Sequence, residues 1–376
     1  MATIVKAYYG FSAIGNNTED SYDNLLLKLP LLPGLNEDKK KQVRTILESI
    51  DKFRVSASVD DLATNNRLIC EGPLKIRYAQ KILQQLKDQI NTRDCHFYAC
   101  NMDDFSPVGM RNTWRILSNK QFDYDEETFL KGAIKALKHL NPVTPLLNIP
   151  NNLLSIIALE HKLKNSNVNF MGENASSQAI YSAINRVSCA RLKEVFVLSS
   201  MYLHFNFVNY LLYFQHIQQL DRLTHSPVSE YAGGIIFQHV NKIKKDQIEV
   251  IFNLSLPSIT PKDSFELDLP KFADTITKTI SIIKSSLLEQ NIKLKDIDLI
   301  LVQSVHQTLI KKLRNSNTPV LDITPFTGYN LCSSAMALSH YACEFLNRDS
   351  NTNNILVIEH DIQGSLWAAV FKKHQG

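Results

Sequence analysis

Apolar residues recur along the chain with two different periods, and these periods alternate from one segment to the next. Continuous apolar runs, typical of buried strands, lie at 4–14, 95–100, 194–200 and 296–304, with a closing pair of strands at 353–373. Apolar residues three and four positions apart, typical of helices, occur at 73–90, 151–163, 178–188, 272–290 and 333–346. Strands that alternate with helices in this way predict an α/β fold with a buried mixed sheet.

Two further apolar runs, at 232–240 and 247–256, are separated by a short polar stretch and predict two strands paired as a hairpin. A helix is also expected within 17–29, where acidic residues follow an Asn or Thr cap. Each half of the chain has a strand that leads into a central buried helix. We therefore expect an internal duplication, with one unit at 1–215 and a second at 216–376.

Composition agrees with a two-unit globular protein and excludes several classes. The chain has 376 residues, which is longer than the roughly 250–300 residues at which a single core stops growing. The net charge is only +4, and no basic run is interleaved with aromatic residues, so nucleic-acid binding is not expected. No apolar run reaches about 18 residues, so no membrane span is expected. The first residues lack a signal-peptide pattern, which favours the cytoplasm.

Cysteine and glycine usage argue against metal and cofactor chemistry. The six cysteines are scattered, and Cys95 and Cys100 have no second metal-type pair, so we expect no metal and mostly buried, reduced thiols. Glycine supplies 12 of 376 residues, about 3%, where ~7% is typical. None of the glycine-rich phosphate-binding motifs is present, and no cofactor is expected.

The stretch MGENASSQAIYSAI, residues 171–184, has the pattern of a bend at the start of a helix. Many enzymes place a nucleophile at such a bend, but here the residue is Glu173. Two interpretations follow. Glu173 is a catalytic acid, or it is a helix-capping or interface carboxylate where a nucleophile has been lost. We favour the second.

Several short segments, in their order along the chain, resemble the β-ketoacyl synthases of the thiolase fold. They are YYGFSAIGNNTEDSYDNLL near the N-terminus, SEYAGGIIF at 229–237, IKLKDIDLILVQS before position 305, TPFTGYNLCSSAMAL after position 323, and DIQGSLWAAVF near the C-terminus. The resemblance implies two similar βαβαβαββ halves that form a layered α-β-α-β-α sandwich.

The resemblance also implies where the reactive groups would lie. Condensing members of the family use a Cys thiolate at a helix N-terminus and two His side chains. Counting back from Ala179 and Ile180 places Glu173 at the Cys position, and the second His corresponds to Tyr329. Thr324 takes the position of a family Lys. The first His corresponds to Gln303 in an ungapped alignment, or to His306 after a three-residue shift; we favour Gln303 because the apolar rhythm of the strand fits.

A ketosynthase-like chain without these groups is similar to a chain length factor, the non-catalytic subunit that pairs with an active ketosynthase in type II polyketide or aryl polyene-type systems. That subunit typically has Gln at the Cys position, from which Glu173 departs. The implied partners are an active ketosynthase and, mainly through it, an acyl carrier protein. The implied tunnel-shaping residues are Met102, Phe105, Val143 and Thr144. The alternatives are a malonyl-carrier-protein decarboxylase and a non-enzymatic acyl-binding homodimer.

Overall fold

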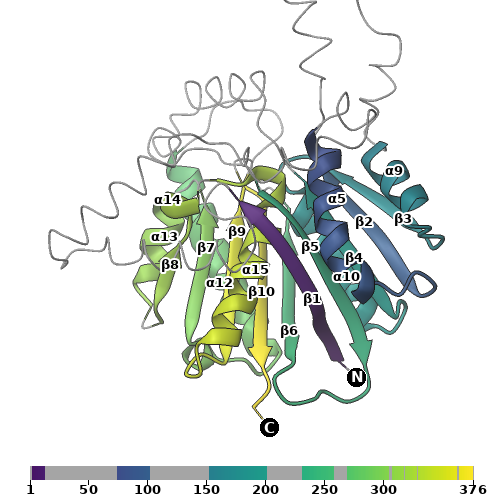
Figure 1. The fold of residues 1–376 in the computed structure, drawn as a ribbon. Helices are drawn as coiled ribbons and strands as arrows, with labels where there is room; N and C mark the ends of the chain where they lie inside the picture. Colours follow the sequence, from purple (N-terminus) through teal and green to yellow (C-terminus); the bar gives the residue numbers. More distant parts are fainter. Residues whose placement is uncertain are drawn as a thin grey trace, which may run out of the picture.

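The strands and helices expected from the periodic segments are present in a computed structural model of the chain (Figure 1). The structure describes residues 2–12, 74–101, 152–200, 231–257, 269–304, 307–316, 318–327, 329–361 and 364–375. The helix predicted at 17–29 and the predicted unit boundary at 215/216 lie outside these residues.

The first group of elements alternates strands with helices and ends in two consecutive strands. In chain order it contains β1 (Ala2–Ser12), α5 (Leu74–Leu86) with the short 3-10 turn η2 (Lys87–Gln89), β2 (Cys95–Asn101), α9 (Asn152–Glu160), β3 (Asn167–Met171), α10 (Ala175–Ser188), β4 (Glu194–Ser200) and β5 (Tyr231–Val240).

The second group has the same order of elements. It contains β6 (Ile248–Leu256), α12 (Leu269–Glu289), η3 (Leu294–Asp296), β7 (Leu299–Ser304), α13 (Gln307–Arg314), β8 (Val320–Asp322), α14 (Thr324–Thr327), η4 (Leu331–Ser333), α15 (Ser334–Arg348), β9 (Asn354–His360) and β10 (Leu366–Lys373). Apart from short additional turns, both groups read βαβαβαββ.

Strand pairing reveals the duplication directly. The ten described strands have the order β3-β2-β4-β5-β1-β6-β10-β9-β7-β8, in which each half runs outward from the centre through equivalent strands. The two halves meet at β1 and β6, which pair through only Ile4 with Glu249 and Val5 with Ile248. The sheet therefore consists of two five-stranded units joined by a short seam. We propose that the first repeat extends through β5 and that the second begins at β6.

The predicted hairpin of 232–240 with 247–256 is wrong. Strand β5 pairs along its whole length with β1, and β6 pairs with β10 and, at the seam, with β1. The first strand of the chain therefore lies between two strands that are consecutive in sequence. Strand β1 thereby completes the first five-stranded unit. Its pairing with β5 joins segments far apart in the sequence, so the spacing of the two apolar runs does not reveal it.

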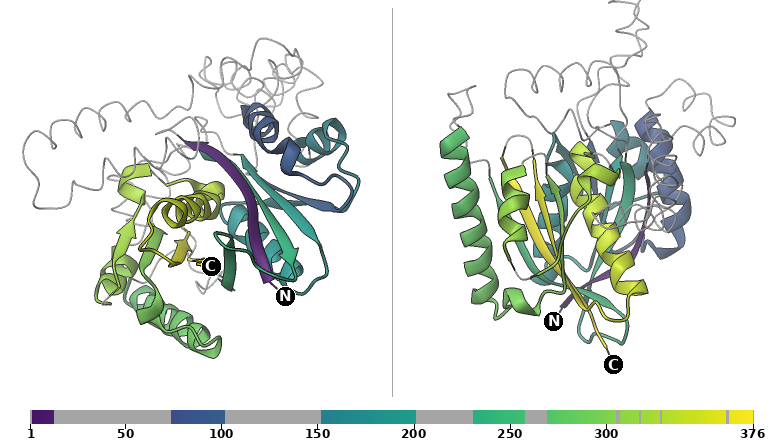
Figure 2. Two further views of the ribbon diagram at one scale, coloured as in Figure 1. Left: turned by 60° about the horizontal axis from the view of Figure 1, so that its bottom comes forward. Right: turned by 90° about the vertical axis from the view of Figure 1, so that its left-hand side faces the viewer.

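Three hydrophobic cores lie between five layers. The largest core surrounds α10 and α15 between the inner faces of the two sheet units. The second core packs α5 and α9 on the outer face of the first unit, and the third packs α12 and α13 on the outer face of the second. Figure 2 shows α5 and α12 on opposite sides of the molecule. The layered α-β-α-β-α sandwich expected from the family resemblance is confirmed.

Helix α10 forms where small and aliphatic residues recur at helical spacing. Ala179, Ile180, Ala183, Ile184 and Val187 are all buried in the central core. The helix ends at Cys189, after which Ala190 takes a left-handed φ of 53°. Cys189 is exposed, in contrast to the burial expected for most cysteines, whereas Cys95, Cys100, Cys332 and Cys343 are buried.

Glycine is required where α15 packs against the first sheet unit. A Cβ on Gly233 would lie 2.5 Å from Cε1 of His340 and 2.9 Å from Cγ of Met336. The ring of His340 hydrogen bonds through Nε2 to the carbonyl of Gly234 (3.1 Å) and through Nδ1 to the hydroxyl of Tyr231 (2.6 Å). Burial lowers the pKa of His340 to about 3, so the neutral ring donates from Nε2 and accepts at Nδ1.

We expect Gly233→Ala to destabilise the protein by about 1–3 kcal/mol, because the added methyl group overlaps the His340 ring. Chemical denaturation measures the loss. In the double variant Gly233→Ala with His340→Ala the overlap with the ring is removed, so the combined loss is smaller than the sum of the two single losses. Additive losses would contradict the close packing of these two residues.

Candidate functional site

The candidate site lies where strand ends from both repeats meet. Glu173 follows β3 in the first repeat, and its carboxyl group interacts with that of Asp361, which follows β9 in the second. Gln303 and Thr324 lie at the end of β7 and directly after β8. In Figure 1, α14, which begins at Thr324, lies at the end of the molecule opposite the two chain termini.

The bend that carries Glu173 has the expected geometry of a strand leading into a helix. Gly172 takes a φ of +105°, which residues other than glycine rarely adopt. Its N–H donates to the carbonyl of Asn101 (3.2 Å). Asn174 is the N-cap residue of α10, and Glu173 precedes it. Glu173 is therefore not the capping residue of α10, and this part of the prediction is wrong. The side chain is 6% exposed, and its Oε2 accepts no hydrogen bond from the described residues.

Burial and a second carboxyl group set the charge of Glu173. Desolvation, followed by repulsion from Asp361, raises the pKa of Glu173 to about 8. Glu359, which is 1% exposed, also has a pKa well above its usual range, because of burial first and the carboxyl groups of Asp361 and Glu173 second. Glu173 is therefore mostly protonated at pH 7, and a protonated carboxyl group is a poor nucleophile for accepting an acyl chain.

Gln303 is fixed in the central layer. Its neighbours on β7 and β9, Leu301 and Val357, belong to the central core, and side chains two residues apart on a strand share a face. Gln303 and its partner across the β7–β9 ladder, Glu359, therefore face α10 and α15. The Gln303 amide donates from Nε2 to Oδ1 of Asn330 (2.8 Å) and to the hydroxyl of Thr327 (3.3 Å). A side-chain amide so placed has no basic group with which to accept a proton.

Thr324 and Tyr329 are both held inside the protein. The hydroxyl oxygen of Thr324 accepts the N–H of Ser304 at 3.1 Å, which joins the start of α14 to the end of β7. Tyr329 has no exposed surface and belongs to the central core. His306, the alternative to Gln303, lies outside the described residues, as do Met102, Phe105, Val143 and Thr144.

The structure thus links two of the positions suggested by the family resemblance, Glu173 and Gln303, through Glu359. Glu173 interacts with Glu359, Glu359 pairs with Gln303, and Gln303 bonds to Asn330, the residue after Tyr329. The sequence did not single out Glu359, and it marked Asp361 only as the first residue of DIQGSLWAAVF, the segment that resembles a C-terminal loop of the family. They end the apolar run NILVIEHD, where acidic residues are typical of an exposed strand end.

The duplication creates a second junction with different chemistry. The residue before the N-cap of α15 is Cys332, which corresponds by position to Glu173, and the penultimate residue of β4 is Ser199, which corresponds to Glu359. The Ser199 hydroxyl bonds to that of Ser333 (2.7 Å) and donates to the carbonyl of Cys332 (3.3 Å). Burial raises the pKa of nearby Cys100 well above its usual range, so its thiol is not a nucleophile.

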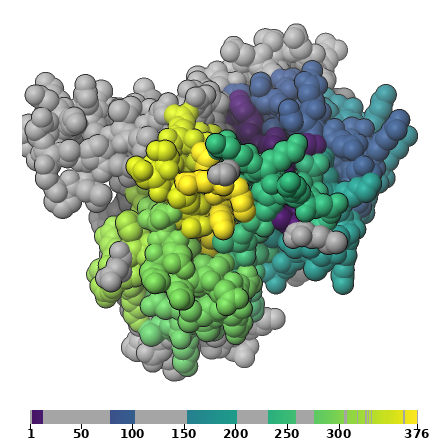
Figure 3. Space-filling view, turned by 90° about the horizontal axis from the view of Figure 1, so that it is seen from below, coloured from purple at the N-terminus to yellow at the C-terminus, as the bar shows by residue number. Residues whose placement is uncertain are grey.

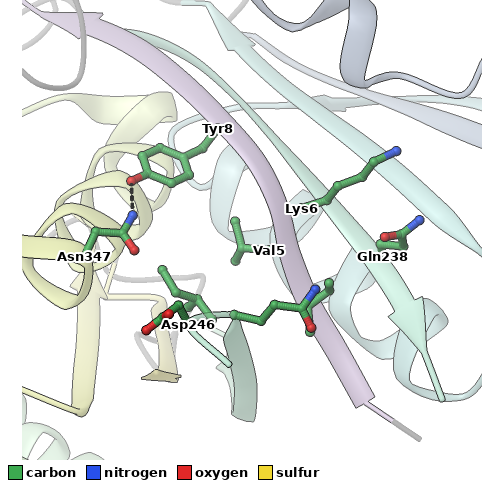
Figure 4. A pocket seen from close by; sticks show the side chains of 9 residues that line it. Val5, Lys6, Tyr8, Gln238, Asp246 and Asn347 are labelled. Carbon is green, nitrogen blue, oxygen red and sulfur yellow. Dashed lines mark hydrogen bonds between the residues drawn. The ribbon is translucent and has the colours of Figure 1, made fainter. Parts of the chain in front are cut away.

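A hollow of about 270 Å³ lies at the seam of the two sheet units, at the other end of the molecule. On one side of it, the amide of Asn347 donates to the hydroxyl of Tyr8 (2.8 Å), and Lys6, Gln238 and Asp246 also line it (Figure 4). The C-terminal residues lie beside the β5–β6 connection here (Figure 3), where Asp246 and His374 bond through their backbones. Ligands of α/β sheets bind beyond the carboxyl ends of parallel strands, so we do not assign the site to this hollow.

Over the described ranges, no group of three His, Cys, Asp or Glu residues has the arrangement of a metal site. No helix in the same part of the chain is both long and apolar enough to cross a membrane.

Comparisons with solved structures identify the fold. The chain is similar to a type II polyketide ketosynthase in complex with its acyl-carrier protein, AntDE:AntF (TM-score 0.67, 15% identity, 99% of both chains covered). It is similar to the ishigamide ketosynthase/chain length factor (TM-score 0.65, 11% identity, both chains covered completely). It is also similar to the ketosynthase ApeO in complex with its chain length factor ApeC from Xenorhabdus doucetiae (TM-score 0.64, 12% identity, 99% of this chain and 98% of that chain covered).

No protein-family model and no curated protein matches the sequence. The chain therefore has the thiolase fold of ketosynthases and chain length factors, with sequence identities that establish the fold alone.

The bond between Gln303 and Asn330 can be tested by truncation. We expect Asn330→Ala to lower the free energy of unfolding by about 1–3 kcal/mol, because the buried amide of Gln303 loses its nearest acceptor. The matched control is Asn351→Ala, which removes an exposed amide. Chemical denaturation of both variants measures the difference, and equal stability would contradict the assigned bond.

Proposed function

We propose that the chain is a non-catalytic chain length factor that forms a heterodimer with an active ketosynthase and shapes the acyl tunnel of a type II polyketide or fatty-acid-like pathway. The observation that supports this most is the retention of the complete ketosynthase fold around a carboxyl group, an amide and a buried phenol at the positions of the reactive groups. The proposed setting is the cytoplasm, and an acyl carrier protein would act mainly through the partner.

The absence of chemistry follows from the properties of these groups. Condensation needs a nucleophile to accept the acyl chain and donors that stabilise an enolate. A mostly protonated Glu173 is a poor nucleophile, and the amide of Gln303 is already bonded to Asn330 and Thr327. The similar structures include complexes named as a ketosynthase with a chain length factor. For this reason we favour the role of a chain length factor over other roles for an inactive ketosynthase-like chain.

We expect the chain alone to release no CO2 from malonyl-loaded carrier protein above the rate of the carrier protein without it. The physical reason is that decarboxylation needs stabilisation of the enolate, which no group in the described site supplies. Radiolabelled malonyl groups make the release measurable, with an active ketosynthase as positive control. Clear release by this chain would instead favour a malonyl-carrier-protein decarboxylase.

The described residues include a surface suited to a partner. Strand β3 ends the sheet order, so within the described chain one of its edges has no neighbouring strand. The N–H of Gly172 and the carbonyl of Ser166 bond to β2, so by alternation the backbone groups of Asn167, Asn169 and Met171 point to the open edge. Open edges invite pairing with another chain.

Helix α9 packs beside this open edge and adds an apolar contribution. Its Leu159 is 80% exposed, more than any other large hydrophobic side chain among the described residues. An apolar side chain next to an unpaired strand is the combination that an obligate interface, typically larger than ~2,000 Å², would cover. The proposal therefore places the ketosynthase against β3 and α9.

We expect Leu159→Asp to weaken the complex with the ketosynthase by at least tenfold in dissociation constant, because the interface would bury a charge. Leu288→Asp is the matched control, since Leu288 is 59% exposed on α12, on the outer face of the second repeat. Co-expression with a ketosynthase encoded beside this chain, followed by size-exclusion chromatography, measures complex formation. Equal behaviour of the two variants would argue against this surface. A homodimer that ignores the ketosynthase would favour the acyl-binding alternative.

The tunnel is the remaining part of the proposal. We retain Met102, Phe105, Val143 and Thr144 as candidates for its lining, on the basis of the family resemblance. Large side chains at such positions would limit the length of the acyl chain, and smaller ones would extend it.

A further inference from the structure

Three buried carboxyl groups lie at the contact between the two repeats. Glu173 stands before α10 of the first repeat, and Glu359 and Asp361 stand at the end of β9 in the second. Their side chains are 6%, 1% and 1% exposed. Ser177, in the first turn of α10, lies within hydrogen-bonding reach of Glu359, so the cluster joins the N-terminal end of α10 to β9.

No cation is among the causes of the raised pKa values of Glu173 and Glu359. Gln303 faces it from β7, and Ser177 faces it from α10. The backbone N–H of Ser365 donates to Oδ1 of Asp361 (2.7 Å). The titratable groups nearest along the chain point elsewhere. The ring of His360 contacts Ser304 on the opposite sheet face.

Among the described residues of the helix and strands packed behind the cluster, three polar or titratable side chains have partners elsewhere. On α15, His340 bonds to Tyr231 and Gly234, and Glu344 bonds to Tyr8. On β10, Trp367 donates to Asn253 of β6.

The hydrogen bonds of the cluster indicate that it holds protons. Oε2 of Glu173 and Oε1 of Glu359 accept no hydrogen bond from the described residues. The single hydroxyl proton of Ser177 is directed at the carbonyl of Asn174 (2.8 Å). The contact of Ser177 with Glu359 favours the ionised carboxylate, but burial and the carboxyl group of Asp361 outweigh it and raise the pKa of Glu359 well above its usual range. The ligand that these groups require is thus the proton.

We propose that Glu173 and Glu359, beside Asp361, form a proton-dependent clamp between the repeats, which holds the N-terminal end of α10 on β9 while these two glutamic acid side chains are protonated and releases it when they ionise. The clamp does not depend on the proposed function, because it follows from the contact between the repeats. It makes the stability of the fold and the order of α10 depend on pH near neutrality.

The direction of the dependence follows from proton linkage. The pKa of Glu173 rises from its usual 4.5 to about 8 in the folded chain, so between these values the folded state holds a proton that the unfolded state has released. Stability is therefore highest below about pH 4.5 with respect to this group, and is lost as the pH rises through about 8. The positive end of the helix dipole favours the opposite sense, but burial and the second carboxyl group outweigh it.

The test compares the unfolding equilibrium of the full chain with that of Glu173→Gln between pH 5.5 and 8. Each proton held only by the folded state changes the unfolding constant about tenfold per pH unit. Gln mimics the neutral carboxyl group. The unfolding constant of the variant should therefore change less with pH than that of the unmodified chain, by up to about tenfold per pH unit. The variant should also be more stable than the unmodified chain at pH 8. Glu289→Gln, at an exposed position on α12, should retain the original slope. Parallel curves for the chain and Glu173→Gln would overturn the proposal.

Hydrogen exchange of the unmodified full chain gives a second measurement that needs no variant. After correction for the intrinsic effect of pH, amides in the first turn of α10 and at 359–361 should lose protection as the pH rises from 6 to 9, while those of α12 should not. Equal changes in protection at the three segments would overturn the clamp, even if Glu173→Gln failed to fold.

Discussion

The whole structure depends on two helices that lie between the two sheet units. Helices α10 and α15 lie between the inner faces of the two sheet units, and each contacts strands of both repeats. Neither sheet unit can cover its inner face without the helix of the other, since the strand pairing between them is limited to two residue pairs at the seam. This mutual burial fixes the position of each helix N-terminal end against the strand ends of the opposite repeat. The candidate site forms where the N-terminal end of α10 meets the strand ends of the second repeat.

A site built this way can lose its chemistry and keep its shape. The packing of α10 relies on Ala179, Ile180 and Ala183, which lie away from the bend and are indifferent to the residue at position 173. The reactive positions are held by backbone geometry, such as the left-handed Gly172 and the ladder between Gln303 and Glu359. Substitution of the reactive groups therefore leaves a folded subunit with the same surface, and a partner that binds that surface would preserve it.

The sequence predicts the long elements well and the short ones poorly. The apolar run 194–200 matches β4 residue for residue, and the helix expected at 178–188 begins only three residues earlier, at Ala175. Strands β3 and β8 and helix α13 were not predicted, because five, three and eight residues are too short for a periodic pattern. The positions of Glu173, Gln303, Tyr329 and Thr324 came from the family resemblance. The burial of Glu359 was not predicted, because burial of a strand end by a helix of the other repeat has no local signature in sequence.

Comparison of the two junctions separates what the fold needs from what this chain has added. The junction at α15 places Cys332, Ser199 and Cys100 where the junction at α10 has Glu173, Glu359 and Gln303, and the hydroxyl of Ser199 bonds there to Ser333 and to the carbonyl of Cys332. The thiolase fold therefore tolerates small neutral residues at this contact. Buried carboxyl groups destabilise a fold unless they hold protons or meet a donor. Three of them at one junction and none among the corresponding residues of the other cannot be a requirement of packing, so their presence is best explained by a property of the junction itself, its response to protons.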